Sequence, residues 1–272
     1  MTAVNKLGKT LSYLFLIIMA FLSVFPLYWM MVSATNTSMD VSAGRLLPGL
    51  ALMDNMKDIM RQMNLWQCLW NSFKISIITT LICVAVSSCA GYAFEIYNDK
   101  YKDRLMAVLL IGVMIPGVAT MIPLYKMIST WKVLDTMWAC ILPSITSIFL
   151  IFLFRQSTRN FPMEVVQAAR VDGLSELGIF FRIYFPMMRS TYATAFILTF
   201  MGSWNNYMWP RIVLIDNGQA TMPLLINSLL TGYSPNFGAV LLGCTMCTLP
   251  ILVMFLSMQK AFANGISGSI KG

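Results

Sequence analysis

The sequence contains no histidine and very few charged residues. Lysine, arginine, aspartate and glutamate together make up 11% of the 272 residues. Soluble domains carry about 25%, so these charges are too few to cover a protein of this size in water. Hydrophobic residues reach 58%, and the mean hydropathy is +0.71. This balance excludes an ordinary soluble domain and indicates that lipid solvates much of the surface.

The charges that are present have a basic surplus, with a formal net charge of +8. Such a surplus is typical of proteins that bind nucleic acid or a membrane surface. A nucleic-acid binder would cluster its basic residues beside a soluble fold. Here they lie in short breaks between long apolar runs, so we expect no nucleic acid and a lipid bilayer instead.

The six cysteines do not indicate a disulfide framework, a metal site or a redox centre. Cys244 and Cys247 form a CxxC pair, but the chain has no second pair and no histidine to complete a zinc site. Their flanks are apolar, so we interpret them as small thiols packed between membrane helices. The lack of histidine and of a convincing nucleophile also argues against an enzyme.

Six apolar runs are long enough to cross a bilayer, which takes roughly 20 residues. The first run exceeds the roughly 7–15 apolar residues of a signal peptide, so we interpret it as an uncleaved helix. We predict one all-α membrane domain over residues 1–272 with six transmembrane helices. The runs are Leu11–Val32, Ser72–Phe94, Leu105–Ile128, Met137–Phe154, Tyr192–Leu214 and Ala239–Met258.

The distribution of lysine and arginine predicts the orientation of these helices. A cytoplasmic N-terminus places twelve basic residues inside and seven outside, and it makes the C-terminus cytoplasmic as well. Residues 33–71 then lie outside, with a surface helix expected at Met53–Leu69. Residues 156–190 form the longest inner segment. Glu95, at the inner end of the second run, is expected to be a solvated boundary residue.

The inner segment has the signals of a helix-turn-helix. Pro162 and Glu164 favour a helix start near Met163. Gly173 is typical of a left-handed turn after a helix ending near Asp172. Ser175 can cap a second helix as far as Tyr184. We expect Pro186 to end that second helix.

The same segment resembles the EAA motif of bacterial ABC-importer permeases, whose pattern is E-A-A-x3-G-x9-I-x-L-P. The matching residues are Gln167, Ala168, Ala169, Gly173, Ile183 and Pro186. Gln167 stands where the family has Glu, which removes an ionic contact but preserves side-chain size. Phe185 stands where the family has Leu.

Similar stretches follow in order along nearly the whole chain. They resemble the ABC permeases of the carbohydrate-importer type, the MalG-like inner membrane components of binding-protein-dependent transport. The stretches are Pro26–Met30, Asn71-Ser72, Met114–Pro116, Ile122–Tyr125, Arg155-Gln156, Ala168–Gly173, Gly202–Pro210 and Gly268–Gly272.

The resemblance implies a set of partners. They are a second, related permease, a dimer of ABC ATPases that uses ATP and Mg²⁺, and an extracellular solute-binding protein, while this chain itself binds no cofactor. The small Ala168 and Ala169 would let the helix sit in a groove of the ATPase, and Arg170 and Asp172 would add polar contacts. Outer segments Asp40–Asn64 and Asp216–Phe237 are expected to face the binding protein. The implied location is the bacterial cytoplasmic membrane.

Polar and aromatic residues in the fifth run are candidates for the substrate pathway. Trp204 and Tyr207 can stack on sugar faces, and Asn205 and Asn206 can bond hydroxyls. Alternatively, Trp204, Tyr207 and Trp209 form an aromatic belt at the membrane interface.

Of the other functions, an ATPase is excluded and an ion-gradient-driven secondary transporter is the alternative. Gly8-Lys9-Thr10 resembles the end of a phosphate loop, but Ala3 stands at the first glycine position and no strand precedes it. An ion-gradient-driven secondary transporter would show intramembrane acids or an internal repeat, and neither is clear. ATP dependence separates it from an ABC importer.

Overall fold

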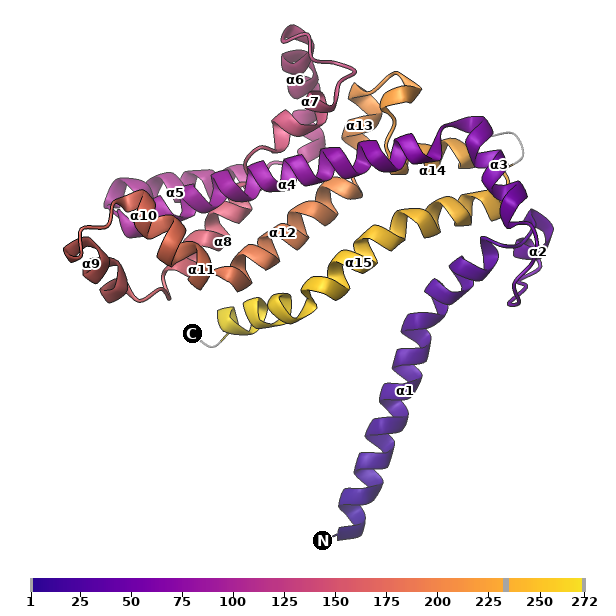
Figure 1. Ribbon diagram of the computed structural model, residues 1–272, viewed down its shortest axis with the longest axis horizontal. Helices are drawn as coiled ribbons and strands as arrows, with labels where there is room; N and C mark the ends of the chain where they lie inside the picture. Colours follow the sequence, from indigo (N-terminus) through magenta and orange to yellow (C-terminus); the bar gives the residue numbers. More distant parts are fainter. Residues whose placement is uncertain (1, 232–234, 271–272) are drawn as a thin grey trace. The chain divides into compact units, whose positions relative to one another are not determined.

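Helices form every regular element that the structure describes. The computed structural model describes residues 2–231 and 235–270, and the all-α prediction is confirmed for them (Figure 1). Short 3-10 turns occur at Leu142–Ser144 and Asn217–Gln219, and a π-helical turn at Phe180–Tyr184. The helices are α1 (Thr2–Ser33), α2 (Ser38–Ser42), α3 (Leu52–Gln62), α4 (Leu65–Ile96), α5 (Lys100–Val113), α6 (Gly117–Thr130), α7 (Met137–Ile141), α8 (Ile148–Thr158), α9 (Met163–Val171), α10 (Glu176–Ile179), α11 (Phe185–Met187), α12 (Arg189–Trp204), α13 (Met208–Val213), α14 (Met222–Leu230) and α15 (Phe237–Ile270).

Three helices are long and apolar enough to cross a membrane unaided. They are α1 over Gly8–Ser33, α4 over Leu65–Ile96 and α15 over Phe237–Gln259. The described residues contain up to five such spans if each of two bent helix pairs counts as one. The chain is therefore a helical membrane protein, as its composition predicted.

Proline explains the division of the third apolar run. Helices α5 and α6 meet at an angle of 98°. Pro116 lies at the break with an extended backbone (φ −58°, ψ 128°). Proline lacks an N–H and disfavours a helical conformation in the residue before it. The apolar run Leu105–Ile128 is therefore divided between two helices that can count as one bent span.

The fourth and fifth runs are also interrupted. The helix over Met137–Ser144 and α8 are bent by 43°, with Pro143 inside the first of them. In the fifth run α12 ends at Trp204 and α13 begins at Met208. The side chain of Asn206, one residue before the N-cap Tyr207, accepts a hydrogen bond at 3.4 Å from Trp209 N in the first turn of α13.

The chain divides into two compact units, and the first comprises Met1–Trp66 and Met222–Leu249. Its core depends on Asn55 of α3, which donates to Ala34 O and Asn36 O at 2.9 Å. Asn236 donates to Asn55 Oδ1 at 3.2 Å and to Asp58 Oδ2 at 2.8 Å. The expected surface helix at Met53–Leu69 is shorter, because the chain turns after Gln62 and α4 begins at Leu65.

The second unit comprises Gln67–Thr221 and Pro250–Gly272. In it α8 lies against α5 and α12 (Figure 1). Helices α4 and α8 approach closely at Gly91, where an added Cβ would lie 2.5 Å from Phe154 Cβ. Cys83 and Val84 of α4, Leu150 and Phe154 of α8 and Ala195 of α12 form one buried cluster there.

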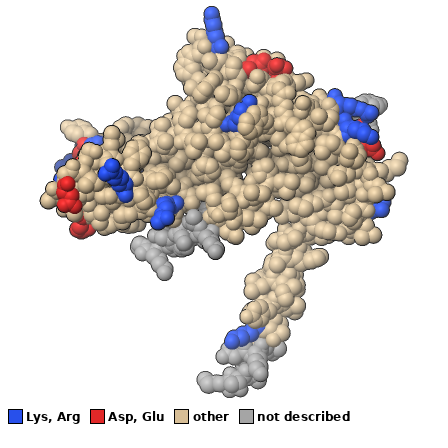
Figure 2. Space-filling view, viewed as in Figure 1, with Lys and Arg blue, Asp and Glu red and all other residues tan. Residues whose placement is uncertain are grey.

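Within the second unit, charged side chains concentrate near the hairpin formed by α9 and α10. Figure 2 shows acidic and basic residues gathered around α9 and α10, whereas most of the visible surface over α4 and α12 carries none. This pattern is what a lipid-facing surface requires. Two of the predicted stretches lie partly outside the described residues. These are Gly268–Gly272, at residues 271 and 272, and Asp216–Phe237, at residues 232–234.

Candidate functional site: an inner hairpin and a polar cavity

Helix α9 ends in a Schellman motif built on Gly173. Leu174 N donates to Ala169 O at 3.0 Å, and Gly173 N donates to Arg170 O at 3.1 Å. Gly173 has φ +79°, in the left-handed region that L side chains avoid. The helix starts at Met163, where the sequence placed it, and ends one residue before Asp172.

An ion pair closes the turn between α9 and α10. Arg170 Nε donates to Glu176 Oε1 at 2.7 Å, and Arg170 Nη2 donates to Glu176 Oε2 at 3.3 Å. The guanidinium lies 5.7 Å from the ring centre of Tyr97, just past the end of α4. Hydrogen bonds from Arg170 and then Tyr97 lower the pKa of Glu176, so its carboxylate stays charged in mildly acidic solution. Ser175 caps α10 by accepting from Gly178 N at 3.2 Å.

An aromatic core joins the hairpin to α4 and α8. Tyr92 of α4 packs edge-on against Phe180 and Tyr184, with ring centres 5.3 and 4.7 Å apart. The hydroxyls of Tyr184 and Thr158 are 2.7 Å apart, which links the π-helical turn to α8. Because this core is buried, the hairpin is fastened to the membrane helices and is not a free loop.

The predicted coupling residues divide between the hairpin surface and its interior. Gln167, Ala168, Arg170, Asp172 and Gly173 are exposed. Ala169 is buried against the aromatic core, and Ile183 packs partly against it. Ala169 therefore faces inward, away from any protein that docks on the hairpin.

The expected helix stop at Pro186 is wrong. Pro186 lies inside α11, which continues the π-helical turn without a break and ends one residue later, at Met187. Its carbonyl accepts a hydrogen bond from Arg189 Nε at 3.0 Å.

Sequence reasoning missed the apolar surface of the hairpin. Val171 is 87% exposed, Leu177 is 72% exposed and Phe181 is 62% exposed. Isolated exposed apolar residues are ordinary. Here three of them lie within 11 positions around the Gly173 turn, where their side chains are available to a protein partner. The signal in the sequence was the apolar residue on each side of the predicted turn.

A buried arginine holds α4, α5 and α8 together beside the hairpin. Arg155 of α8 has only 7% of its side chain exposed, and its Nε donates to Glu95 Oε2 of α4 at 3.1 Å. It also pairs with Asp103 of α5, and Arg159 Nε lies 3.6 Å from Glu95 Oε1. The prediction that Glu95 is solvated is wrong, because its side chain is 18% exposed and lies between two arginines.

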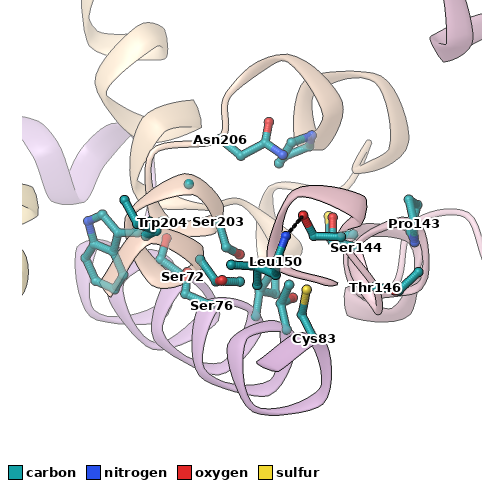
Figure 3. A pocket seen from close by; sticks show the side chains of 18 of the residues that line it. Ser72, Ser76, Cys83, Pro143, Ser144, Thr146, Leu150, Ser203, Trp204 and Asn206 are labelled. Atoms are coloured by element: carbon teal, nitrogen blue, oxygen red, sulfur yellow. Dashed lines mark hydrogen bonds between the residues drawn. The ribbon is translucent and has the colours of Figure 1, made fainter. Parts of the chain in front are cut away.

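The second unit contains a polar cavity of about 350 Å³ between α4, the α7–α8 bend, α12 and the chain before α13. Figure 3 shows Ser72 and Ser76 projecting from α4 toward Ser203 and Leu150, with Asn206 across from them. All of its lining residues are uncharged. Its polar members are Ser72, Ser76, Thr79, Ser144, Thr146, Ser147, Thr199, Ser203, Asn206 and Thr221.

Three of the buried hydroxyls in this lining have no hydrogen-bond partner within the described part of the chain. They belong to Ser76, Thr79 and Thr221, which are 1%, 2% and 4% exposed. An unpaired buried hydroxyl costs free energy. Asn71 holds the chain just before Thr221 against α4, because its Nδ2 donates to Gly218 O at 2.9 Å and to Ala220 O at 3.1 Å.

The four predicted pathway residues do not share one location. Trp204 and Asn206 line the cavity, whereas Asn205 caps the end of α12 and is exposed, and Tyr207 precedes α13. The aromatic-belt alternative is wrong for two of its three members. Trp204 is 2% exposed and stacks on Phe200, and Trp209 is 6% exposed and donates to Ala139 O at 2.8 Å.

Neither the hairpin nor the cavity contains a candidate metal centre. Throughout the described residues, no group of three or more cysteine, aspartate or glutamate side chains is placed to hold a metal ion. The described residues thus form a helical membrane protein with an exposed hairpin and an uncharged polar cavity.

A family profile identifies the kind of transport protein. The profile described as "Binding-protein-dependent transport system inner membrane component" matches residues 87–268. The chain belongs to this family. It is thus a permease component of a binding-protein-dependent ABC importer, and ATP hydrolysis belongs to a separate subunit.

Curated relatives match the whole length of the chain. It is 44% identical to the lactose transport system permease protein LacG of Rhizobium radiobacter, with 98% of each chain covered. It is 34% identical to the arabinooligosaccharides transport system permease protein AraQ of Halalkalibacterium halodurans, covering 98% of this chain and 99% of the relative. It is 30% identical to the sn-glycerol-3-phosphate transport system permease protein UgpE of Escherichia coli, covering 96% of each.

A solved structure shares the fold. One chain in the crystal structure of a bacterial ABC transporter involved in the import of the acidic polysaccharide alginate superposes with a TM-score of 0.79. The match covers 96% of this chain and 99% of that chain at 17% sequence identity. At this identity the likeness concerns the fold alone.

Proposed function

We propose that this chain is one of two related permease subunits of an importer that carries sugars or oligosaccharides across the bacterial cytoplasmic membrane by alternating access. The identity of 44% to a lactose permease over 98% of the chain supports the substrate class. The exposed hairpin α9–α10, fastened to α4 and α8 through its buried core, is the single structural observation that carries the mechanism.

The hairpin is proposed to be the contact with an ABC ATPase dimer. Its surface offers Gln167, Ala168, Asp172 and the exposed apolar side chains of Val171 and Leu177. Its interior, through Ala169, Ile183 and the neighbouring Pro186, transmits force to the membrane helices. ATP and Mg²⁺ are bound and used by the ATPases, whereas this chain binds no cofactor. Closure of the ATPases would then move the hairpin and α4 together.

The proposed topology has six spans and cytoplasmic termini. The two bent pairs would each make one span, and α12, with the chain after it, would make the sixth. This arrangement puts the hairpin and twelve of the 19 basic residues on the cytoplasmic side. It also puts the outer segments Asp40–Asn64 and Asp216–Phe237 where an extracellular solute-binding protein would dock.

The substrate pathway is proposed to run past the end of α12. Trp204 and Asn206 line the cavity there, and Asn205 and Tyr207 lie in the same break between α12 and α13. A break in a helix leaves backbone groups to be satisfied, which membrane proteins tolerate where they line a cavity.

Substitution of Gly173 tests the coupling role. A β-branched side chain at φ +79° is strongly strained, so Gly173→Val should disrupt the turn and abolish ATP-dependent sugar uptake while the chain still inserts. Gly173→Asn is the matched control, since asparagine tolerates the left-handed region. The first measurement is uptake of radiolabelled lactose by membrane vesicles that contain the full importer. The second is co-purification of the ATPase through a tag on this chain.

Two results would contradict the proposal. Normal uptake by Gly173→Val would remove the coupling role from the hairpin. Uptake that continues without ATP and stops when the proton or sodium gradient is removed would indicate a secondary carrier. Purification of this chain without any ATPase would also favour that alternative.

A further inference from the structure

We infer that the polar cavity is a subsite for one residue of a neutral saccharide and that it discriminates against anionic sugars. The inference rests on the proposed function, because it assumes that the importer carries a saccharide. It goes further by assigning a binding site to this subunit and a charge to the ligand.

The unpaired hydroxyls point to a ligand rich in hydrogen-bonding groups. Ser76 and Thr79 lie one turn apart on α4, and Thr221 lies on the chain that leads into α14. All three are at least 96% buried, and their oxygens have no partner in the part of the chain that the structure describes. Natural proteins rarely leave such groups unpaired, so a bound hydroxyl-rich molecule is the simplest explanation of three in one cavity.

The remaining lining suits a sugar ring. Asn206 adds an amide that can both donate and accept, while Ile75, Leu150 and Leu198 supply apolar surface for the C–H faces of the ring. The volume of about 350 Å³ lies near the lower end of the range for ligand pockets. It matches a small saccharide unit better than a long chain.

The absence of charge in the lining determines the selectivity. Every described lining residue is uncharged, so no arginine or lysine there can pair with a carboxylate or phosphate. Moving an anion from water to a lining that offers no cationic partner is unfavourable. A uronate or a sugar phosphate should therefore bind much more weakly than the neutral sugar.

A pair of adjacent threonines provides the test. Thr79 lines the cavity with a free hydroxyl, whereas its neighbour Thr80 is fully buried and its Oγ1 donates to Ser76 O at 2.6 Å. Thr80 is not part of the lining. Thr79→Val removes a ligand contact and Thr80→Val removes only a bond within the helix, while both keep the size and branching of the side chain.

The probe is tritiated lactose, and the measurement is its dissociation constant by equilibrium dialysis. The complete permease–ATPase assembly is held in nanodiscs without the binding protein, so that only the membrane subunits contribute. We expect Thr79→Val to raise the dissociation constant roughly two- to tenfold, the effect of one neutral hydrogen bond. Thr80→Val should leave it unchanged. Lactobionate, the carboxylate derivative of lactose, should compete at least about tenfold less well than lactose.

The melting temperature gives an independent readout. Thr79→Val replaces an unpaired buried hydroxyl by a methyl group, so its melting temperature should be equal to or above that of the wild type. A Ser76→Ala, Thr79→Val, Thr221→Val triple variant provides the larger effect. A triple variant that folds and binds lactose as tightly as the wild type would overturn the inference. Competition by lactobionate equal to that by lactose would also overturn it.

Failure of the proposed function would give different results from failure of the cavity inference. A wild-type importer that neither binds nor accumulates lactose, or any of a set of neutral mono- and disaccharides, contradicts sugar transport itself. Wild-type uptake of such sugars with unaltered binding in the triple variant contradicts only the cavity.

Discussion

At the scale of single residues, the structure places its buried charge where partners satisfy it. Arg155 has 7% of its side chain exposed and contacts carboxylates on two other helices. Glu95 accepts a hydrogen bond from Arg155 and lies within ion-pair distance of Arg159. A lone charge at this depth would be costly, and a group of paired charges is tolerated because each charge lies beside one of opposite sign. The group fixes the relative positions of α4, α5 and α8.

Removal of Glu95 should loosen this arrangement. Glu95→Ala leaves Arg155 with Asp103 alone, and breaking a buried pair costs about 3–5 kcal/mol. We expect a clear fall in the apparent melting temperature of the detergent-solubilised importer. The loss of stability should lie toward the lower end of that range, because Asp103 remains as a partner of Arg155. Glu164→Ala, on the exposed first turn of α9, is the control and should cost less than about 1 kcal/mol. An equal fall in both variants would show that the ion group does not contribute specifically.

At the scale of elements, α4 connects the cavity with the inner hairpin. Ser72, Ser76 and Thr79 of this one helix line the cavity, and Tyr92, farther along, packs into the hairpin core. A continuous helix transmits displacement along its axis because each turn is hydrogen-bonded to the next. Ser87 Oγ, 3.4 Å from Ser147 N, adds a contact to the cap of α8 between these two ends.

The close approach of α4 and α8 at Gly91 can be tested directly. An added Cβ would lie 2.5 Å from Phe154 Cβ and 2.9 Å from Arg155 N. Gly91→Val should therefore separate the helices, at a cost of about 1–3 kcal/mol or more for overpacking. We expect a lower melting temperature and impaired ATP-dependent uptake.

Gly112 provides the matched control for Gly91. It also lies in an apolar helix, but no neighbouring atom lies within 4 Å of its added Cβ among the residues described. Gly112→Val should leave the melting temperature and uptake nearly unchanged in the same assays. A similar loss in both variants would assign the effect to helix propensity instead of to packing.

At the scale of the whole molecule, orientation decides which surfaces meet which partners. A single inner hairpin can contact ATPases only if residues 156–190 lie in the cytoplasm. The charge bias of twelve basic residues against seven supports this orientation.

Single cysteines in a background without the six native ones test this topology. A membrane-impermeant maleimide should label Asp172→Cys only in inside-out vesicles and Arg45→Cys only in intact, right-side-out membranes. Both positions are exposed in the isolated chain, so in membranes that contain this chain without the ATPases access to them depends on the side of the membrane rather than on burial. Labelling of Asp172→Cys from outside would reverse the proposed orientation and remove the hairpin from contact with the ATPases.

The sequence anticipated local features of the hairpin better than the course of the membrane helices. Gly173, Ser175 and the start at Met163 were predictable because caps and left-handed turns depend on neighbouring residues. The apolar runs were found as well, because hydropathy is a property of composition. Hydropathy alone did not show their interruption at Pro116 and at Asn205, because it measures composition and not the direction of the backbone.

By itself, the sequence determined that this protein is helical, embedded in lipid and a member of a permease family. Those properties follow from composition and from residues close together in the chain. Only the tertiary structure decided that Glu95 meets Arg155 across 60 positions and that Ala169 faces inward. It alone brought the free hydroxyls of Ser76 and Thr221 into one cavity. Such contacts depend on how helices distant in sequence pack, and packing joins residues that no local pattern relates.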